Sequence, residues 1–148
     1  MQKENYRNSI SPLLFFLLIV FSSFAKAEAQ KVELSFRANG KFKIVQFTDV
    51  HWDPQKTETQ EASETMCHIL DEEKPDLIIY TGDIITGSPI SEAIDSVFMI
   101  AERRHIPFAY TFGNHDDESD MTRQEIFEAL KKFEYNHCCP GKFFCGNR

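Results

Sequence analysis

The apolar and polar positions after residue 31 first alternate with the two-residue period of a β-strand. From 32 to 36, apolar residues are separated by polar or charged ones, and Asn39-Gly40 then offers the two residues of a type I′ turn. The strand pattern resumes from 42 to 47, so the sequence predicts an antiparallel hairpin. We expect the second strand to end in a polar segment, 48–51, shortly before Pro54.

Beyond Pro54 the pattern changes to helices separated by short apolar strands. Three segments carry apolar residues at helical spacing, which predicts three helices with these buried positions: Ala62, Met66, Ile69 and Leu70; Ile90, Ala93, Ile94, Val97, Phe98 and Ala101; Ile126, Phe127, Leu130 and Phe133. The third helix should begin at Thr122, because Glu125 completes a capping box. Between the helices, the apolar runs 77–80 and 107–112 are typical of parallel strands buried on both faces.

Strands that alternate with helices predict an α/β fold with a parallel sheet, in which the carboxyl ends of the strands meet at one edge. Polar residues follow each predicted strand: Asp49 and His51, then Asp83, then Asn114-His115-Asp116. Asp83 lies 34 residues after Asp49, and Asn114 lies 31 residues after Asp83. Both separations are close to the roughly 30 residues of one βαβ unit. The three clusters should therefore be neighbours in space.

Two carboxylates, an imidazole and an amide oxygen at one sheet edge suit zinc, iron or manganese. Like charges gathered there would repel each other unless cations lay between them, and one carboxylate can bridge two ions about 3.5–4 Å apart. Such a pair would lower the pKa of a shared water and hold a phosphoryl oxygen for in-line attack. His115 would then protonate the departing alkoxide, while Asp116 would orient its ring.

Each cluster alone also has an ordinary structural interpretation. Asp-x-His and Gly-Asp are common where a strand turns, and Gly-Asn-His-Asp suits a turn because Gly and Asn tolerate positive φ. The occurrence of all three in order, each after an apolar strand, favours a metal site over three unrelated turns.

These motifs resemble those of the calcineurin-like metallophosphoesterases. Asp49-x-His51, Gly82-Asp83 and Gly113-Asn114-His115-Asp116 match the first three motifs of that family, in order and at the usual spacing. The segments 43–49 and 82–87 are similar to the small branch related to purple acid phosphatases. The resemblance covers residues 31–135. It implies a metallophosphoesterase-type β-sandwich flanked by helices, of which this chain holds the N-terminal βαβαβ half.

The resemblance also implies an enzyme, a metal-dependent hydrolase of phosphate mono- or diesters with two divalent or trivalent ions of iron, zinc or manganese. By its motifs, Asp49 and His51 would hold the first ion, Asp83 would bridge both, and Asn114 would hold the second. His115 would contact the phosphate or act as the acid.

The sequence departs from the family at two points. Thr86 stands three residues after Asp83, where purple acid phosphatases have the tyrosine whose phenolate binds ferric iron. The family completes its site with a later isolated His and a Gly-His-x-His motif, whereas this sequence has only His137 after Asp116. We therefore expect a fragment with an incomplete metal site and low or no phosphatase activity. The alternatives are an inactive remnant or a non-catalytic α/β binding module without metal.

The first 27 residues read as a secretory signal peptide. Lys3 and Arg7 precede an apolar stretch from 10 to 24, and Ala25-Lys26-Ala27 offers small residues for cleavage. The apolar core of about 15 residues is shorter than the roughly 20 that cross a bilayer. We therefore expect an exported protein, periplasmic or extracellular, without a stable membrane anchor.

Composition, charge and cysteine spacing limit the classes of partner and ligand that the chain can bind. The chain has 42% hydrophobic and 26% charged residues, as expected of one globular domain, and its formal charge of −7 argues against nucleic-acid binding. A small phosphorylated substrate fits, since metal ions would supply positive charge. Cys67 stands alone, and Cys138, Cys139 and Cys145 crowd an unassigned tail, 136–148, without the paired spacing of a zinc cluster.

Overall fold

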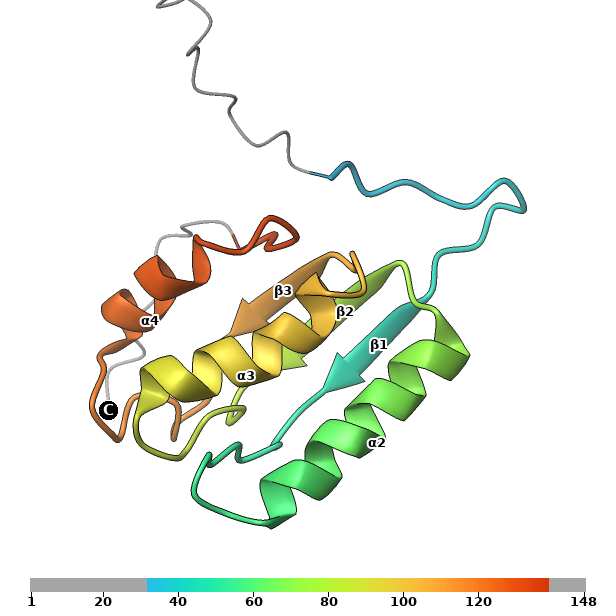
Figure 1. Cartoon of the computed structure of the whole chain (residues 1–148). Coiled ribbons are helices and arrows are strands. Elements are labelled where there is room, and N and C mark those ends of the chain that lie inside the picture. Colours follow the sequence, from blue (N-terminus) through green and yellow to red (C-terminus); the bar gives the residue numbers. More distant parts are fainter. Residues whose placement is uncertain (1–31, 139–148) are drawn as a thin grey trace, which may run out of the picture. The chain divides into compact units, whose positions relative to one another are not determined.

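The computed structural model describes residues 32–138, which contain a parallel sheet of three strands in the order β1-β2-β3 (Figure 1). The strands are β1 (Ile44–Phe47), β2 (Leu77–Thr81) and β3 (Phe108–Thr111). The helices α2 (Glu58–Glu73), α3 (Ile90–Glu102) and α4 (Arg123–Leu130) follow the strands in turn. This βαβαβ order with a parallel sheet confirms the α/β fold that the sequence predicts.

The helices begin and end where local chemistry requires it. α2 ends at Glu73 because Lys74 takes a left-handed conformation, with φ of 45°, and Pro75 follows. α4 begins after Thr122, whose side chain accepts from the Glu125 N–H, while the Glu125 carboxylate accepts from the Thr122 N–H. The predicted capping box is therefore confirmed.

The N-terminus of α3 is fixed by a distant loop. Its N-cap residue, Pro89, makes no side-chain capping bond, and the Ile90 N–H instead donates to Asp120 Oδ1 at 2.9 Å. All six apolar residues predicted for its buried face are buried. The apolar face of α3 is thus packed in the core. The bond from Ile90 to Asp120 connects the N-terminus of α3 to the loop after β3.

Helices α2 and α3 cover one face of the sheet, and α4 lies beside α3 (Figure 1). On that face Ile78, Tyr80 and Phe108 are completely buried. Residues that pair across parallel strands point to the same side, and the opposite face carries Ile44 paired with Leu77 and Gln46 paired with Ile79. Ile44 is 50% exposed, and Leu77 and Ile79 are only half-buried. The expectation that residues 77–80 are buried on both faces was therefore wrong: among the residues that the structure describes, only one face of this strand is fully covered.

The predicted hairpin was also wrong. The Gly40 N–H donates to the Arg37 carbonyl at 2.8 Å and the Arg37 N–H to the Lys41 carbonyl at 2.9 Å, so the turn has three loop residues instead of two. Gly40 has φ of 73°, as the last residue of such a loop requires. Residues 32–36 form no strand, and the chain leaving the turn pairs instead with β2: the Asp76 N–H donates to the Lys43 carbonyl at 2.8 Å.

Residues beyond α4 return to the outer edge of β3. The Phe108 N–H donates to the Tyr135 carbonyl at 2.9 Å, and the His137 N–H donates to the Phe108 carbonyl at 2.7 Å. This is a parallel bridge between Phe108 and Asn136. The edge of β3 is therefore partly paired at this position.

Within residues 32–138, no helix combines the length and the apolar character needed to cross a bilayer. The predicted signal peptide, 1–27, lies outside the described residues, as do Cys139 and Cys145.

Candidate metal centre

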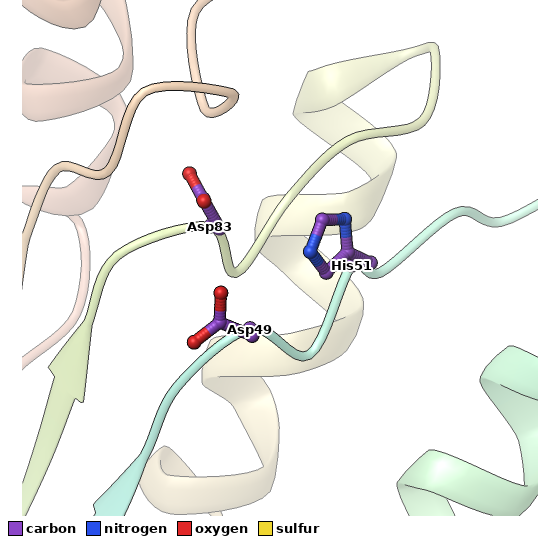
Figure 2. A group of neighbouring side chains, drawn as sticks. All are labelled: Asp49, His51 and Asp83. Carbon is purple, nitrogen blue, oxygen red and sulfur yellow. The ribbon is translucent and has the colours of Figure 1, made fainter.

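Three of the predicted ligands lie together at the carboxyl edge of the sheet. Asp49, His51 and Asp83 each offer a ligand atom, and these atoms all lie within 4.8 Å of one another. Asp49 and His51 come from the loop after β1 and Asp83 from the loop after β2, as Figure 2 shows. The structure thus brings together residues more than 30 positions apart, as the strand order predicts.

The backbone at these three residues has an uncommon conformation. Asp49 and His51 each have φ of 52° and Asp83 has φ of 51°, in the left-handed region that few residues other than glycine adopt. Such conformations persist only where the surrounding structure holds them, and they are frequent at functional sites. Here they turn the two loops so that all three side chains project to one place.

Hydrogen bonds between the two loops hold this conformation. The Asp49 N–H donates to the Gly82 carbonyl at 3.1 Å and the His51 N–H to the Asp83 carbonyl at 3.0 Å. One residue further, the Trp52 N–H donates to the Ile84 carbonyl at 2.7 Å. The parallel pairing of β1 with β2 therefore continues, in distorted form, through the ligand residues.

Asp116 is the anchor of the site. It is completely buried, and its carboxylate accepts four backbone N–H groups: Asp83 at 2.9 Å, Ile84 at 2.8 Å, Ile85 at 3.0 Å and Gly113 at 2.7 Å. We expected this carboxylate to orient the ring of His115, and that role was wrong. Asp116 follows His115 in sequence but points inward, where it satisfies backbone donors that burial would otherwise leave unpaired.

Two glycines allow the loops after β2 and β3 to touch. A Cβ added at Gly82 would lie 2.7 Å from the Gly113 Cα, and one added at Gly113 would lie 2.2 Å from Asp83 Oδ1. Gly82 also has φ of 91°. Both motifs therefore need glycine at these positions. A side chain at Gly82 would meet the backbone of Gly113, and one at Gly113 would push Asp83 out of place.

His115 lies beside the ligand group. Its N–H donates to Asp83 Oδ1 at 2.8 Å, and its ring centroid is 5.9 Å from that of His51. The ring Nδ1 lies 2.7 Å from Glu118 Oε2. This hydrogen bond raises the pKa of His115 above its usual value, and the charges of Glu118, Asp83 and Asp116 act in the same direction.

Sequence reasoning missed Glu118. The signal that could have found it is its place three residues after His115, the spacing at which the ends of a tight turn meet. The Glu118 N–H donates to the His115 carbonyl at 3.3 Å and closes that turn.

Asn114, the fourth predicted ligand, is exposed on the loop after β3. Its two neighbours, Gly113 and His115, both bond to the carboxylates of Asp116 or Asp83, so it lies next to the ligand group. Arg123 holds the same loop from the other side by donating to the Gly113 carbonyl at 2.8 Å.

The donor set of the site fits a metal ion. Two carboxylates and one imidazole are ligands that zinc, iron and manganese accept. Asp49 and His51 are exposed, so an ion can reach them from solvent, while Asp83 is only 9% exposed and is held in place by the surrounding loops. The two carboxylates repel each other unless a cation lies between them.

Comparison with known proteins gives the same picture. Residues 42–145 match the family model described as calcineurin-like phosphoesterase. The Arabidopsis thaliana protein named probable inactive purple acid phosphatase 29 is 36% identical over 123 residues, which cover 72% of this chain and 32% of that protein. Phosphatase DCR2 of Saccharomyces cerevisiae is 34% identical over 114 residues, which cover 66% of this chain and 20% of that protein.

A bacterial relative is also similar. The uncharacterized metallophosphoesterase YkuE of Bacillus subtilis is 38% identical over 77 residues, which cover 51% of this chain and 26% of that protein. The chain thus spans about a third or less of the length of these relatives.

Proposed function

Because the chain belongs to the calcineurin-like phosphoesterase family, we propose that it carries the first part of a site that hydrolyses phosphate esters with two bound metal ions. The observation that carries the proposal is the convergence of Asp49, His51 and Asp83, each in a left-handed backbone conformation, to within 4.8 Å. A conformation that costs free energy at three adjacent ligands is hard to explain as a chance arrangement of turns.

The proposed roles of the ligands follow from their positions. Asp49 and His51, on the exposed loop, would hold one ion. Asp83, between the loops after β1 and β3, would contact both ions, and Asn114 would hold the other. When bound, the ions would offset charge on the phosphoryl group and activate water for attack.

His115 would handle the leaving group. Its ring lies beside His51 and is held by Glu118, and its backbone is bound to Asp83. From there it would donate a proton to the departing ester oxygen, which helps most when the leaving group is a poor one. Asp116 would act only by holding the loops in place.

We further propose that the substrate is a small phosphorylated molecule and that the protein is exported. The acidic chain repels nucleic acid, and it would attract a phosphate only through bound cations. The shallow, exposed position of Asp49 and His51 supports access for a small anionic substrate.

Metal content and turnover test the proposal directly. We expect the full chain, loaded with manganese, zinc or iron, to retain metal after desalting, and Asp83→Asn to lose most of it. Asp71→Asn is the control, because Asp71 is an exposed acid near the end of α2 that accepts from Arg104 Nε at 2.7 Å. Retention of metal by Asp83→Asn at the level of the control would contradict the ligand assignment.

Turnover of p-nitrophenyl phosphate and bis-p-nitrophenyl phosphate tests the catalytic half of the proposal. We expect slow hydrolysis, because the second ion has only Asp83 and Asn114 as candidate ligands among the described residues. Rates within the usual range of about 1–10³ per second would show that these ligands suffice.

A second candidate function is metal binding without hydrolysis. This candidate is favoured by several relatives that are named as inactive, among them probable inactive purple acid phosphatases 14 and 29 of Arabidopsis thaliana. Bound metal with no turnover of either nitrophenyl ester would support this candidate, and absence of both would favour a binding module without metal.

A further inference from the structure

His115 is held at its backbone by the candidate metal centre and at its ring by its own loop. Its backbone N–H is bound to Asp83, and the turn from His115 to Glu118 is closed by the Glu118 N–H. At the end of the side chain, Nδ1 lies 2.7 Å from Glu118 Oε2. The ring and the Glu118 carboxylate are thus joined, and the backbone of His115 is fixed by its bond to Asp83.

The other three acids of the loop after β3 bind elsewhere. Asp116 is buried and accepts four backbone N–H groups, Asp117 forms an ion pair with Arg123 at 3.1 Å, and Asp120 accepts from the Ile90 N–H at 2.9 Å. Glu118 is therefore the carboxylate of the loop that reaches the ring. An imidazole nitrogen that bonds to a carboxylate carries a proton. The contact with Glu118 therefore places a proton on Nδ1 of His115.

We propose that Glu118 is a positioning residue for His115: it fixes the proton on Nδ1 and the orientation of the ring, so that Nε2 is the nitrogen presented to the substrate. The catalytic consequence rests on the proposed function, but the contact itself does not. Glu118 would contact no metal and no substrate. It would act by removing the rotation of the ring that would otherwise have to be restricted in the transition state.

Nuclear magnetic resonance of the ring nitrogens in the full chain tests the contact without any need for activity. In alkaline buffer, where the rings are neutral, we expect His115 to carry its proton on Nδ1 in the wild-type chain. Glu118→Gln should keep this tautomer, because an amide oxygen still accepts from Nδ1. Glu118→Ala should lose it. The signal is assigned among the five histidines with His115→Gln.

Matched controls separate positioning from general damage. Asp117→Asn changes the neighbouring exposed acid and should leave the His115 tautomer unchanged, as should the ring of His68 on α2 in every variant. The amide spectrum reports whether each variant is folded. A His115 ring that has its proton on Nε2 in the wild-type chain, or keeps the same tautomer in a folded Glu118→Ala, would overturn the proposal.

Kinetics give the second readout where turnover is measurable. Glu118→Ala should lower kcat for an alkyl phosphate by about 10- to 100-fold with little change in KM, and Glu118→Gln should recover most of it. The loss should be smaller for p-nitrophenyl phosphate, whose leaving group needs no proton. An equal loss for both esters would count against positioning. If no variant turns over but the tautomer shifts as expected, the proposed function fails while the positioning contact stands.

Discussion

The candidate metal centre consists of two regions that differ in burial and in what holds them. One, the frame, contains Asp116, Gly113 and Asp83, and its polar atoms are satisfied by backbone hydrogen bonds between the loops after β2 and β3. The other, the rim, contains Asp49, His51 and His115, whose side chains reach solvent. The frame is complete in the protein alone, whereas the Asp49 carboxylate of the rim accepts from the Thr48 hydroxyl and would gain a charged partner when a cation binds.

The two regions differ in how their carboxylates affect the stability of the fold. Asp116 offsets the cost of its burial with four N–H donors, and so the frame contributes to the stability of the fold. Asp49 lies near Asp83, and their mutual repulsion opposes folding. We therefore expect substitutions in the frame to lower the stability of the metal-free chain, and those that change or displace Asp83 to weaken metal binding as well. Substitutions in the rim should act mainly on metal binding.

The largest effect should come from Asp116→Ala. The substitution would leave four backbone N–H groups without this acceptor, three of them buried, and we expect it to lower the free energy of unfolding by about 3–5 kcal/mol. Denaturant unfolding of the metal-free chain measures this change. The control, Asp117→Ala, removes an exposed ion pair and should cost below about 1 kcal/mol. Equal unfolding midpoints for the two variants would remove the distinction between frame and rim.

The role of Asp116 also shows where reasoning from the sequence stops. Apolar spacing is enough to predict α3, because six apolar residues on one face of a helix are buried only when that face packs against the core. The order of strands and helices is enough to place Asp49, Asp83 and Asn114 after successive strands. It does not show which way neighbouring side chains point. His115 and Asp116 are adjacent, yet one faces the site and the other the interior, because the backbone donors of residues 83–85 require an acceptor.

Other features depend on contacts that no local pattern reveals. The left-handed conformations of Asp49, His51 and Asp83 follow from the pairing of two loops distant in sequence. The segment 32–36 has the alternation of a strand, but Lys43 pairs with Asp76 in the sheet and the turn before it has three residues. Glu118 reaches His115 only because the loop after β3 closes into a turn.

A smaller effect on stability is expected from Gly113→Ala, a change within the frame at the point where it contacts Asp83. The new Cβ would lie 2.2 Å from Asp83 Oδ1 and 2.4 Å from the Asp83 nitrogen, so the loop has to move. We expect a loss of about 1–3 kcal/mol in unfolding free energy, together with weaker manganese binding because Asp83 is displaced.

Gly40→Ala is the matched control for this variant. Gly40 also has positive φ, but no atom lies within 4 Å of a Cβ added there. Its replacement should cost about 1 kcal/mol through backbone strain and leave manganese binding unchanged. If Gly113→Ala binds manganese as tightly as Gly40→Ala does, the close approach of the loops is not what positions Asp83.

The smallest effect on the metal-free chain should come from Asp49→Asn, in the rim. Asn keeps an oxygen that can accept from the Thr48 hydroxyl, and it removes the repulsion between Asp49 and Asp83. The free energy of unfolding of the metal-free variant should therefore rise slightly or stay the same, within about 0.5 kcal/mol.

With manganese the order of stability of the two chains should reverse. A ligand present at about 100 times its Kd stabilises the wild-type chain by about 2.7 kcal/mol, and the variant would lose most of this gain. Thermal unfolding of both chains, with and without manganese, measures the reversal. The control Asp95→Asn changes an exposed acid of α3 that is paired with Lys132, and it should show no reversal. A variant destabilised without metal, or stabilised by manganese as much as the wild-type chain, would show that Asp49 belongs with the frame and not with the rim.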